Sequence, residues 1–317
     1  MIAEIAEIAA DAAPDLILHT GDLFDGPRPA MTEFGRAIRA LRTLAEVAPV
    51  VVLAGNHDSS AALEVLGIAV SDGHAADVAA GRFNPHARCG HRIRVHHKAT
   101  VPDAGAVTTY ATAAGIDLRL AALPFVHQNR VLTDYAAICD ANASYNDSIR
   151  KIIDVITDVC LDGFDPTRNV AVLASHLHVN GARTSSEREL HVSTAYATDP
   201  AHLHEAYGYL AFGHIHVPQP FASGRGRYAG SILQVDFGES GETKQVNLVD
   251  LEPGRRTAVT GLPLTAGRRL HRLRTPLSTL RPRRRRRWRP RRGDRRARTG
   301  RRDDRPGLSG GDRRTKL

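Results

Sequence analysis

Four short apolar runs, each followed at once by a polar cluster, constrain the fold of this chain more than any other feature. Runs this short suit strands buried on both faces better than helices. The clusters contain Asp, Asn and His, which bind metal ions or move protons. They are Leu16-Ile17-Leu18 before His19-Thr20-Gly21-Asp22-Leu23-Phe24-Asp25, Val50 to Ala54 before Gly55-Asn56-His57-Asp58, Val170 to Ala174 before Ser175-His176-Leu177-His178, and Tyr209 to Phe212 before Gly213-His214-Ile215-His216.

Helical patterns separate these strands. Apolar residues recur at helical spacing in three segments: Ile2, Ile5, Ile8 and Ala9; Phe34, Ile38, Leu41 and Ala45; and Ile149, Ile152, Ile153 and Ile156 within 145–160. Residues 243–251 alternate as a half-exposed strand would, whereas 72–115 show no clear pattern. Buried strands that alternate with helices predict an α/β domain.

The positive charge of the chain is confined to its end. Residues 281–317 hold 17 Arg, one Lys and four Asp, a net charge of +14, whereas residues 1–280 carry −5. A basic fold is therefore excluded as the source of the overall +9. With so few apolar residues, we expect 275–317 to be disordered. This tail is either a basic arm for nucleic acid phosphates or the out-of-frame reading of a GC-rich gene.

Other classes of protein are disfavoured. The three cysteines, Cys89, Cys139 and Cys160, have no CxxC spacing, which argues against a disulfide framework or a thiolate zinc site. No apolar run is long enough for a membrane span. The first residues lack the cationic and apolar regions of a secretory signal. We therefore expect a soluble cytoplasmic protein that does not bind membranes.

The four polar clusters are expected to meet in one crevice, because open α/β sheets place their sites at the carboxyl ends of strands. Their carboxylate, amide and imidazole groups suit manganese, iron or zinc. Asp22 can bridge two cations. The imidazoles of His214 and His216 share a side if this segment is extended, and can splay toward two metals if it turns. His57 can face the leaving group.

The ordered set Gly-Asp-x-x-Asp, Gly-Asn-His-Asp, a strand-end His and Gly-His-x-His resembles the calcineurin-like metallophosphoesterases. The resemblance implies a four-layer α-β-β-α sandwich at 1–237, the beginning of a capping region at 238–274, and the tail at 275–317. It also implies two divalent ions, most simply Mn²⁺. Asp22 would bridge them, Asn56, His176 and His214 would complete the second ion, and His216 would bind the first. His57 would be the catalytic acid, and His178 is a rival to His176.

Within this superfamily the chain is similar to the SbcD-type subunits of bacterial SbcCD nucleases over roughly 1–270. The similarity rests on the segments Gly21 to Asp25, Val52 to Ser59, His176 with Val179-Asn180-Gly181, and Tyr228-Ala229-Gly230-Ser231. It implies a phosphodiester hydrolase, an exonuclease and endonuclease acting on double-strand DNA ends and hairpins in DNA repair and recombination. It further implies an SbcC-type ATPase partner and a homodimer of the SbcD-type chain.

The chain departs from the family pattern at both ends. The family opens with a strand ending in Asp-x-His, which gives the first metal two ligands, and nothing similar precedes Asp22. The Asp72-Gly73-His74 segment comes too late in the order to replace it. We therefore expect an N-terminal truncation and an aberrant C-terminus. Two alternatives stay open: a small-molecule phosphodiesterase of the same fold, and a non-catalytic form whose first metal site is broken.

Overall fold

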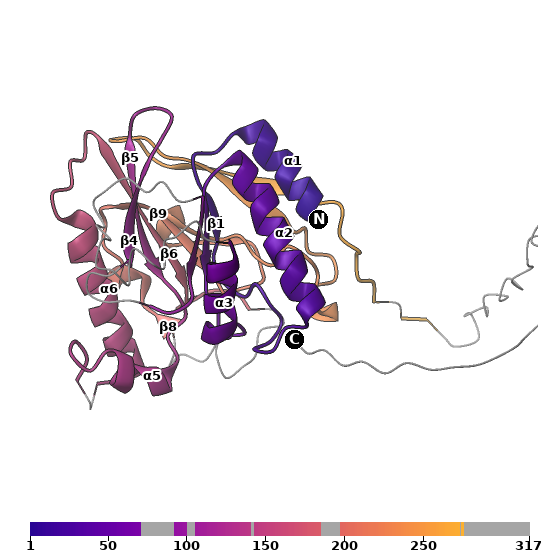
Figure 1. Cartoon of the computed structure of the whole chain (residues 1–317), viewed down its shortest axis with the longest axis horizontal. Helices are drawn as coiled ribbons and strands as arrows, with labels where there is room; N and C mark the ends of the chain where they lie inside the picture. Colours follow the sequence, from indigo (N-terminus) through magenta and orange to yellow (C-terminus); the bar gives the residue numbers. More distant parts are fainter. Residues whose placement is uncertain (71–91, 100–104, 141–142, 185–196, 273, 276–317) are drawn as a thin grey trace, which may run out of the picture. The chain divides into compact units, whose positions relative to one another are not determined.

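Two β-sheets form the centre of residues 1–272 in the computed structural model, which describes residues 1–70, 92–99, 105–140, 143–184, 197–272 and 274–275 (Figure 1). The smaller sheet has the order β1-β2-β3, and its strands are all parallel. The larger has the order β10-β11-β9-β6-β5-β4, and its outermost strands, β10 and β4, run antiparallel to their neighbours. The strands are β1 (Ile17–His19), β2 (Val50–Leu53), β3 (Ile93–His96), β4 (Val107–Ala111), β5 (Asp117–Leu123), β6 (Asn169–His176), β9 (Tyr207–Gly213), β10 (Gln219–Phe221) and β11 (Gly226–Tyr228).

The remaining elements cover these sheets or connect their strands. Two short strands, β7 and β8, pair with each other, as do β12 and β13. The bounds are β7 (His178–Val179), β8 (Ala197–Thr198), β12 (Gln245–Asp250), β13 (Ala258–Pro263), α1 (Ile2–Ala12), α2 (Met31–Val47), α3 (Ser60–Val70), α5 (Gln128–Asp134), α6 (Tyr145–Leu161), and the 3₁₀ turns η3 (Pro200–His202), η4 (Ala222–Gly224) and η5 (Phe237–Glu239).

Alternation along the strands creates three apolar cores and therefore four layers. In β2, Val50 and Val52 pack toward α2 and α3, while Val51 and Leu53 pack toward the larger sheet. In β6, Val172 belongs to the core between the sheets, whereas its neighbour Leu173 belongs to the core beneath α6. Successive side chains of a strand point to opposite faces, so α1–α3 cover one sheet and α5 and α6 the other (Figure 1).

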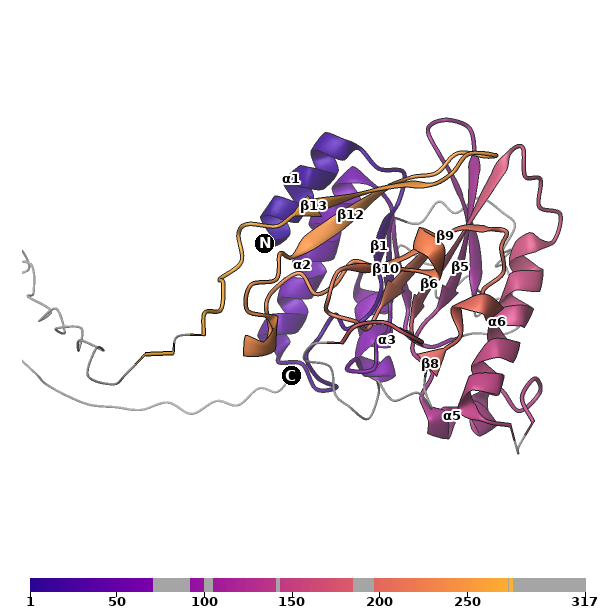
Figure 2. The same cartoon turned by 180° about the vertical axis from the view of Figure 1, so that it is seen from behind.

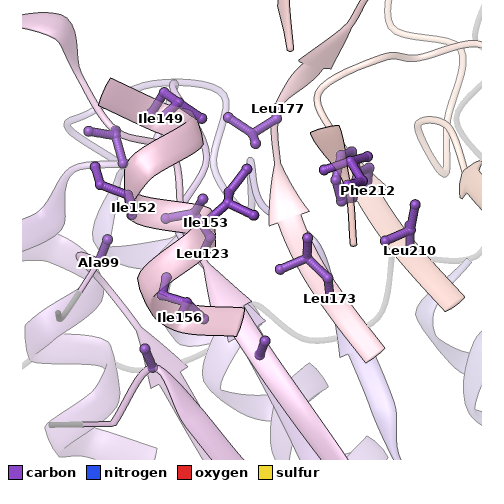
Figure 3. Packing of buried hydrophobic residues seen from close by; sticks show 14 of the residues in the cluster. Ala99, Leu123, Ile149, Ile152, Ile153, Ile156, Leu173, Leu177, Leu210 and Phe212 are labelled. Carbon is purple, nitrogen blue, oxygen red and sulfur yellow. The ribbon is translucent and has the colours of Figure 1, made fainter. Parts of the chain in front are cut away.

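Helix α6 supplies much of the core on its side of the larger sheet. It begins at the N-cap residue Ser144, whose hydroxyl oxygen accepts a hydrogen bond from the backbone N–H of Asp147 at 3.1 Å. Four isoleucines at helical spacing then face β5, β6 and β9 (Figure 3): Ile149, Ile152, Ile153 and Ile156. All four are buried, so this helix is fixed on the sheet by apolar contacts.

The structure confirms the predicted α/β class and corrects several details. The three predicted helices and the strands β2, β6 and β9 are present. The first strand begins one residue later than predicted and is half-buried rather than buried, because β1 is an edge strand. Strands β3 and β4 lie in the region left unassigned between 72 and 115, and α3, β5 and α5 were not predicted.

Residues beyond the larger sheet pack back onto the body. Val249, Leu251 and Val259 of the β12–β13 region join the core between the sheets. Figure 2 shows β13 running beside α1. The carboxylate of Glu4 in α1 accepts hydrogen bonds from the backbone N–H groups of Thr265 and Ala266, at 2.7 and 2.9 Å. The half-exposed strand predicted at 243–251 is confirmed as β12. The predicted domain boundaries stay predictions, and the predicted tail lies outside the described residues apart from 275.

Two expectations from composition can be compared with the described residues. No helix among them has both the length and the apolar character needed to cross a membrane. Cys139 and Cys160 are buried and free, and burial raises the pKa of the Cys160 thiol to about 12. Cys89 and the Asp72-Gly73-His74 segment lie outside the described residues.

Replacing Ile152 by Ala should lower the free energy of unfolding by about 2–5 kcal/mol, because the truncation leaves a cavity beneath α6. Urea denaturation monitored by circular dichroism measures the effect. The matched control is Ile68→Ala in α3, where the side chain is 65% exposed and the change should stay within about 0.5 kcal/mol. Equal losses for both variants would contradict the described core.

Candidate metal centre

The loops after β1, β2, β6 and β9 meet at one edge of the two sheets. The Nδ1–H of His176, at the end of β6, donates to the backbone carbonyl of Thr20, after β1, at 2.7 Å. The backbone N–H of Phe125, after β5, donates to the carbonyl of Ala54, after β2, at 2.9 Å. Each contact joins one sheet to the other, so side chains from separate strand ends share one site.

Four of the predicted site residues lie together there. The Oδ1 atom of Asn56 is 2.9 Å from Nε2 of His176 and 3.0 Å from Nδ1 of His214. Oδ2 of Asp22 lies 3.3 Å from the same Nε2 of His176. In the described part of the chain, Asp22, His176 and His214 form the one group of three His, Cys, Asp or Glu residues whose ligand atoms all lie within 4.8 Å of one another.

Three oxygen atoms lie close to the imidazole of His176: the backbone carbonyl of Thr20 and side-chain oxygens of Asn56 and Asp22. Burial opposes a charge on His176, but the Asp22 carboxylate raises its pKa above the ordinary value. Burial likewise opposes ionisation of Asp22, but the His176 imidazole and the hydrogen bond from the backbone N–H of His57 hold its pKa well below the ordinary value. Nε2 is the atom of His176 that faces both Asn56 and Asp22.

One buried carboxylate holds the two loops that carry Asp22 and Asn56. The side chain of Asp58 accepts hydrogen bonds from the backbone N–H groups of Leu23, Phe24 and Gly55, at 3.1, 3.0 and 2.9 Å. Three charge-assisted hydrogen bonds to one buried group fix the loops against each other. Sequence analysis quoted Asp58 within a motif but gave it no role.

Close backbone approach explains three glycines of the site. A Cβ atom built at Gly21, Gly55 or Gly213 would lie within 3.0 Å of His176, Asp22 or Thr20 respectively. Asp22 and His214 themselves have φ angles of 55° and 94°, a region that non-glycine residues adopt at a cost. The backbone is therefore held in a strained form where the polar groups gather.

His216 is not among the three residues whose ligand atoms all lie within 4.8 Å of one another. Its Nδ1–H donates to the carboxylate of Glu239 at 2.8 Å, while His214 contacts Asn56. The segment turns at His214, so the splayed arrangement of the two imidazoles is the one observed. The rival residue His178 is buried in β7, and its ring centroid lies 6.3 Å from that of His214.

His57 lies beside the cluster and is half-buried. Its backbone N–H donates to Oδ1 of Asp22 at 2.9 Å, and its Nδ1–H donates to the carbonyl of Asp25 at the same distance. These contacts orient the ring next to the group formed by Asp22, His176 and His214. They do not test the predicted catalytic role.

Two further residues that contact the predicted site residues, Phe125 and Glu239, were not predicted from the sequence. The ring of Phe125 lies against the group, with centroids 6.1 Å from His176 and 6.3 Å from His214. It follows β5, which was not predicted as a strand, so its strand-end position gave no signal. Glu239 follows no apolar run of the kind that marked the other site residues.

Replacing Gly55 by Ala should lower the free energy of unfolding by about 1–3 kcal/mol, because the methyl group would meet both the carboxylate and the backbone nitrogen of Asp22. Thermal denaturation measures the change. The control is Gly26→Ala in the adjacent loop, where nothing lies within 4 Å of the added atom. A Gly55→Ala protein as stable as the control would mean that these loops do not pack as described.

Two curated relatives resemble this chain over most of its length. The chain is 29% identical over 276 residues to the SbcD protein of the SbcCD nuclease from Bacillus subtilis (strain 168), which covers 84% of this chain and 64% of that protein. It is 24% identical over 264 residues to the protein of the same name from Staphylococcus epidermidis (strain ATCC 12228 / FDA PCI 1200), covering 81% and 61%. These relatives confirm the predicted similarity to SbcD-type subunits, and the chain spans under two thirds of their length.

A family model covers the part of the chain that carries the described group. Residues 1–218 match the model described as "Calcineurin-like phosphoesterase". This range includes both sheets up to β9 and all the predicted site residues. The chain therefore belongs to the calcineurin-like phosphoesterase family.

Proposed function

We propose that this chain is the nuclease subunit of an SbcD-type enzyme that hydrolyses DNA phosphodiester bonds with two divalent cations. The observation that carries the proposal is the convergence of Asp22, Asn56, His176 and His214 at one edge of the two sheets. The names of the two relatives, which place them in a nuclease, support the choice of DNA as substrate.

The donor atoms fit a divalent transition metal. Oxygen atoms of Asn56 and Asp22 both lie close to Nε2 of His176, so these three side chains offer donor atoms to a single cation. Carboxylate, amide and imidazole donors without thiolate suit Mn²⁺. Asp22, Asn56, His176 and His214 would hold one ion, and Asp22 and His216 would hold the other. When bound, two such ions stabilise the attacking and leaving oxygens of a phosphodiester.

The protein groups then have separate tasks. With its Nδ1–H donated to the Asp25 carbonyl, His57 has Nε2 as the ring atom that can give a proton to the leaving oxygen. The carboxylate of Asp58 keeps the Asp22 loop in register with the Asn56 loop. The ring of Phe125 lies against the imidazoles of His176 and His214 on one side of the group.

The names of the two relatives also support proposals for the protein partner, the DNA substrates, the cellular process and the location of this chain. Both relatives are named as one component of a nuclease called SbcCD, so we propose an SbcC-type ATPase as partner and a homodimer of this chain. We further propose double-strand DNA ends and hairpins as substrates, DNA repair and recombination as the process, and the cytoplasm as the location.

The 317-residue chain supplied with Mn²⁺ should degrade linear duplex DNA at an impaired rate, because only Asp22 and His216 would hold one of the two ions. Chelation by EDTA should abolish this activity. Asn56→Ala should reduce the rate about 100-fold or more, since it removes an oxygen that faces two imidazoles. Asn180→Ala, at an exposed position four residues after His176, is the control and should be unaffected. Release of labelled nucleotides measures the rates. Hydrolysis of an aryl phosphodiester without hydrolysis of DNA would instead favour a small-molecule phosphodiesterase.

Replacing His57 by Asn should slow DNA cleavage by about 10²- to 10⁴-fold without loss of bound metal, because the variant keeps the backbone N–H that contacts Asp22. Steady-state cleavage rates and metal content by mass spectrometry are compared with those of His202→Asn, a substitution at an exposed histidine. A variant that cleaves DNA as fast as the unmodified chain would exclude His57 as the proton donor.

A further inference from the structure

A fully buried carboxylate lies next to His216, outside the group of Asp22, Asn56, His176 and His214. Glu239, at the end of η5, has a side chain that is 0% exposed. Its Oε1 accepts from Nδ1 of His216 at 2.8 Å, and its Oε2 accepts from Nζ of Lys244 at 2.8 Å. The backbone N–H of Val235 also donates to Oε2 at 3.1 Å. The hydroxyl of Ser231, which donates to the Leu233 carbonyl at 2.8 Å, lies 3.3 Å from the same Oε2.

This burial is unusual for its segment. Val235 and Phe237 are apolar and 61% and 53% exposed, yet Glu239 between them and β12 is completely buried. Burying a carboxylate costs several kcal/mol unless it is paired and hydrogen-bonded. An apolar side chain would fill this place at lower cost, so stability alone does not account for the choice of Glu.

Lys244 supplies the compensating charge and holds the same histidine. Its side chain is 5% exposed, and its Nζ donates to Glu239, to Glu242 at 2.7 Å and to the backbone carbonyl of His216 at 3.2 Å. The backbone N–H of Ser231 donates to the same carbonyl at 3.1 Å. Both the backbone and the ring of His216 are therefore fixed by residues from 231–244.

The hydrogen bond to Glu239 also selects which tautomer of the His216 imidazole is present. An ionised carboxylate can only accept, so Nδ1 carries a proton, and in the neutral imidazole the lone pair is then on Nε2. In metalloproteins a carboxylate that accepts from one ring nitrogen of a histidine orients the other nitrogen toward the metal and increases its basicity.

We propose that Glu239, with Lys244 as its counter-charge, is a positioning residue that holds His216 in the Nδ1–H form required of a metal ligand. The proposal rests on the proposed function, because it assigns His216 to a cation. It places a working part of the site beyond residues 1–218, the range that matches the family model.

The test compares Glu239→Gln with the matched control Glu242→Gln. Both variants remove a carboxylate that contacts Nζ of Lys244, but Glu239 alone contacts His216. ¹⁵N NMR of the ring nitrogens, assigned with His216→Gln, reports the proportion of the Nδ1–H form in metal-free protein at one pH. Titration with Mn²⁺ alone then gives the affinity for each ion.

We expect the unmodified chain and Glu242→Gln to show the Nδ1–H form at His216, and Glu239→Gln to show a mixture of the two tautomers. The Mn²⁺ that Asp22 and His216 would hold has fewer protein ligands and should be the weaker-bound ion. Its affinity should fall about 10- to 100-fold in Glu239→Gln, while the other ion is retained. An unchanged tautomer and unchanged affinity in Glu239→Gln would overturn the proposal and make Glu239 a purely structural group.

The two readouts separate this proposal from the proposed function. If the unmodified chain binds no Mn²⁺, the proposed function fails, whereas the tautomer of His216 still decides whether Glu239 positions it. Should Glu239→Gln not fold, the double variant Glu239→Gln with Lys244→Met removes both buried charges, a replacement that is often tolerated. A folded double variant with unchanged tautomer and unchanged Mn²⁺ affinity would equally overturn the proposal.

Discussion

The hydrogen bond from His176 to the carbonyl of Thr20 joins the two sheets at the edge where the polar residues gather. The core between the sheets consists of apolar side chains, whose contacts are non-directional and fix distance better than register. A hydrogen bond from a buried ring to a backbone carbonyl does fix register. Because Asp22 follows Thr20 by two residues, the same contact decides where that carboxylate lies relative to the His176 ring.

The backbone around this contact adopts strained conformations and close approaches that bring the polar groups of the site together. Gly21, Gly55 and Gly213 leave room for neighbouring groups that any side chain would displace, and Asp22 and His214 adopt positive φ angles. Strain of this kind persists when the surroundings over-determine it. Here the surroundings include the three hydrogen bonds to Asp58, which tie the Asp22 loop to the loop after β2.

Sequence patterns predicted the elements whose residues are apolar and missed those whose burial depends on tertiary contacts. Strand β2 is apolar throughout and was predicted correctly, as were the strand-end positions of Asn56 and His176. Strand β5 was missed because Arg119 interrupts its apolar residues. Arg119 is buried only because its guanidinium donates to three carbonyls at the end of α6: those of Cys160, Asp162 and Gly163. Glu239 was missed for the same reason, since its partners His216 and Lys244 come together only in the folded chain.

The turn at His214 gives the two neighbouring histidines, His214 and His216, different hydrogen-bond partners. On an extended segment, His214 and His216 would share one side and compete for one place. With φ of 94° at His214, one imidazole reaches Asn56 and the other reaches Glu239. Two neighbouring histidines thus belong to two separate groups of oxygen atoms, one formed at the strand ends and one formed by residues 231–244. This arrangement supports the proposed pair of cations, because each ring is oriented by its own hydrogen-bond partners.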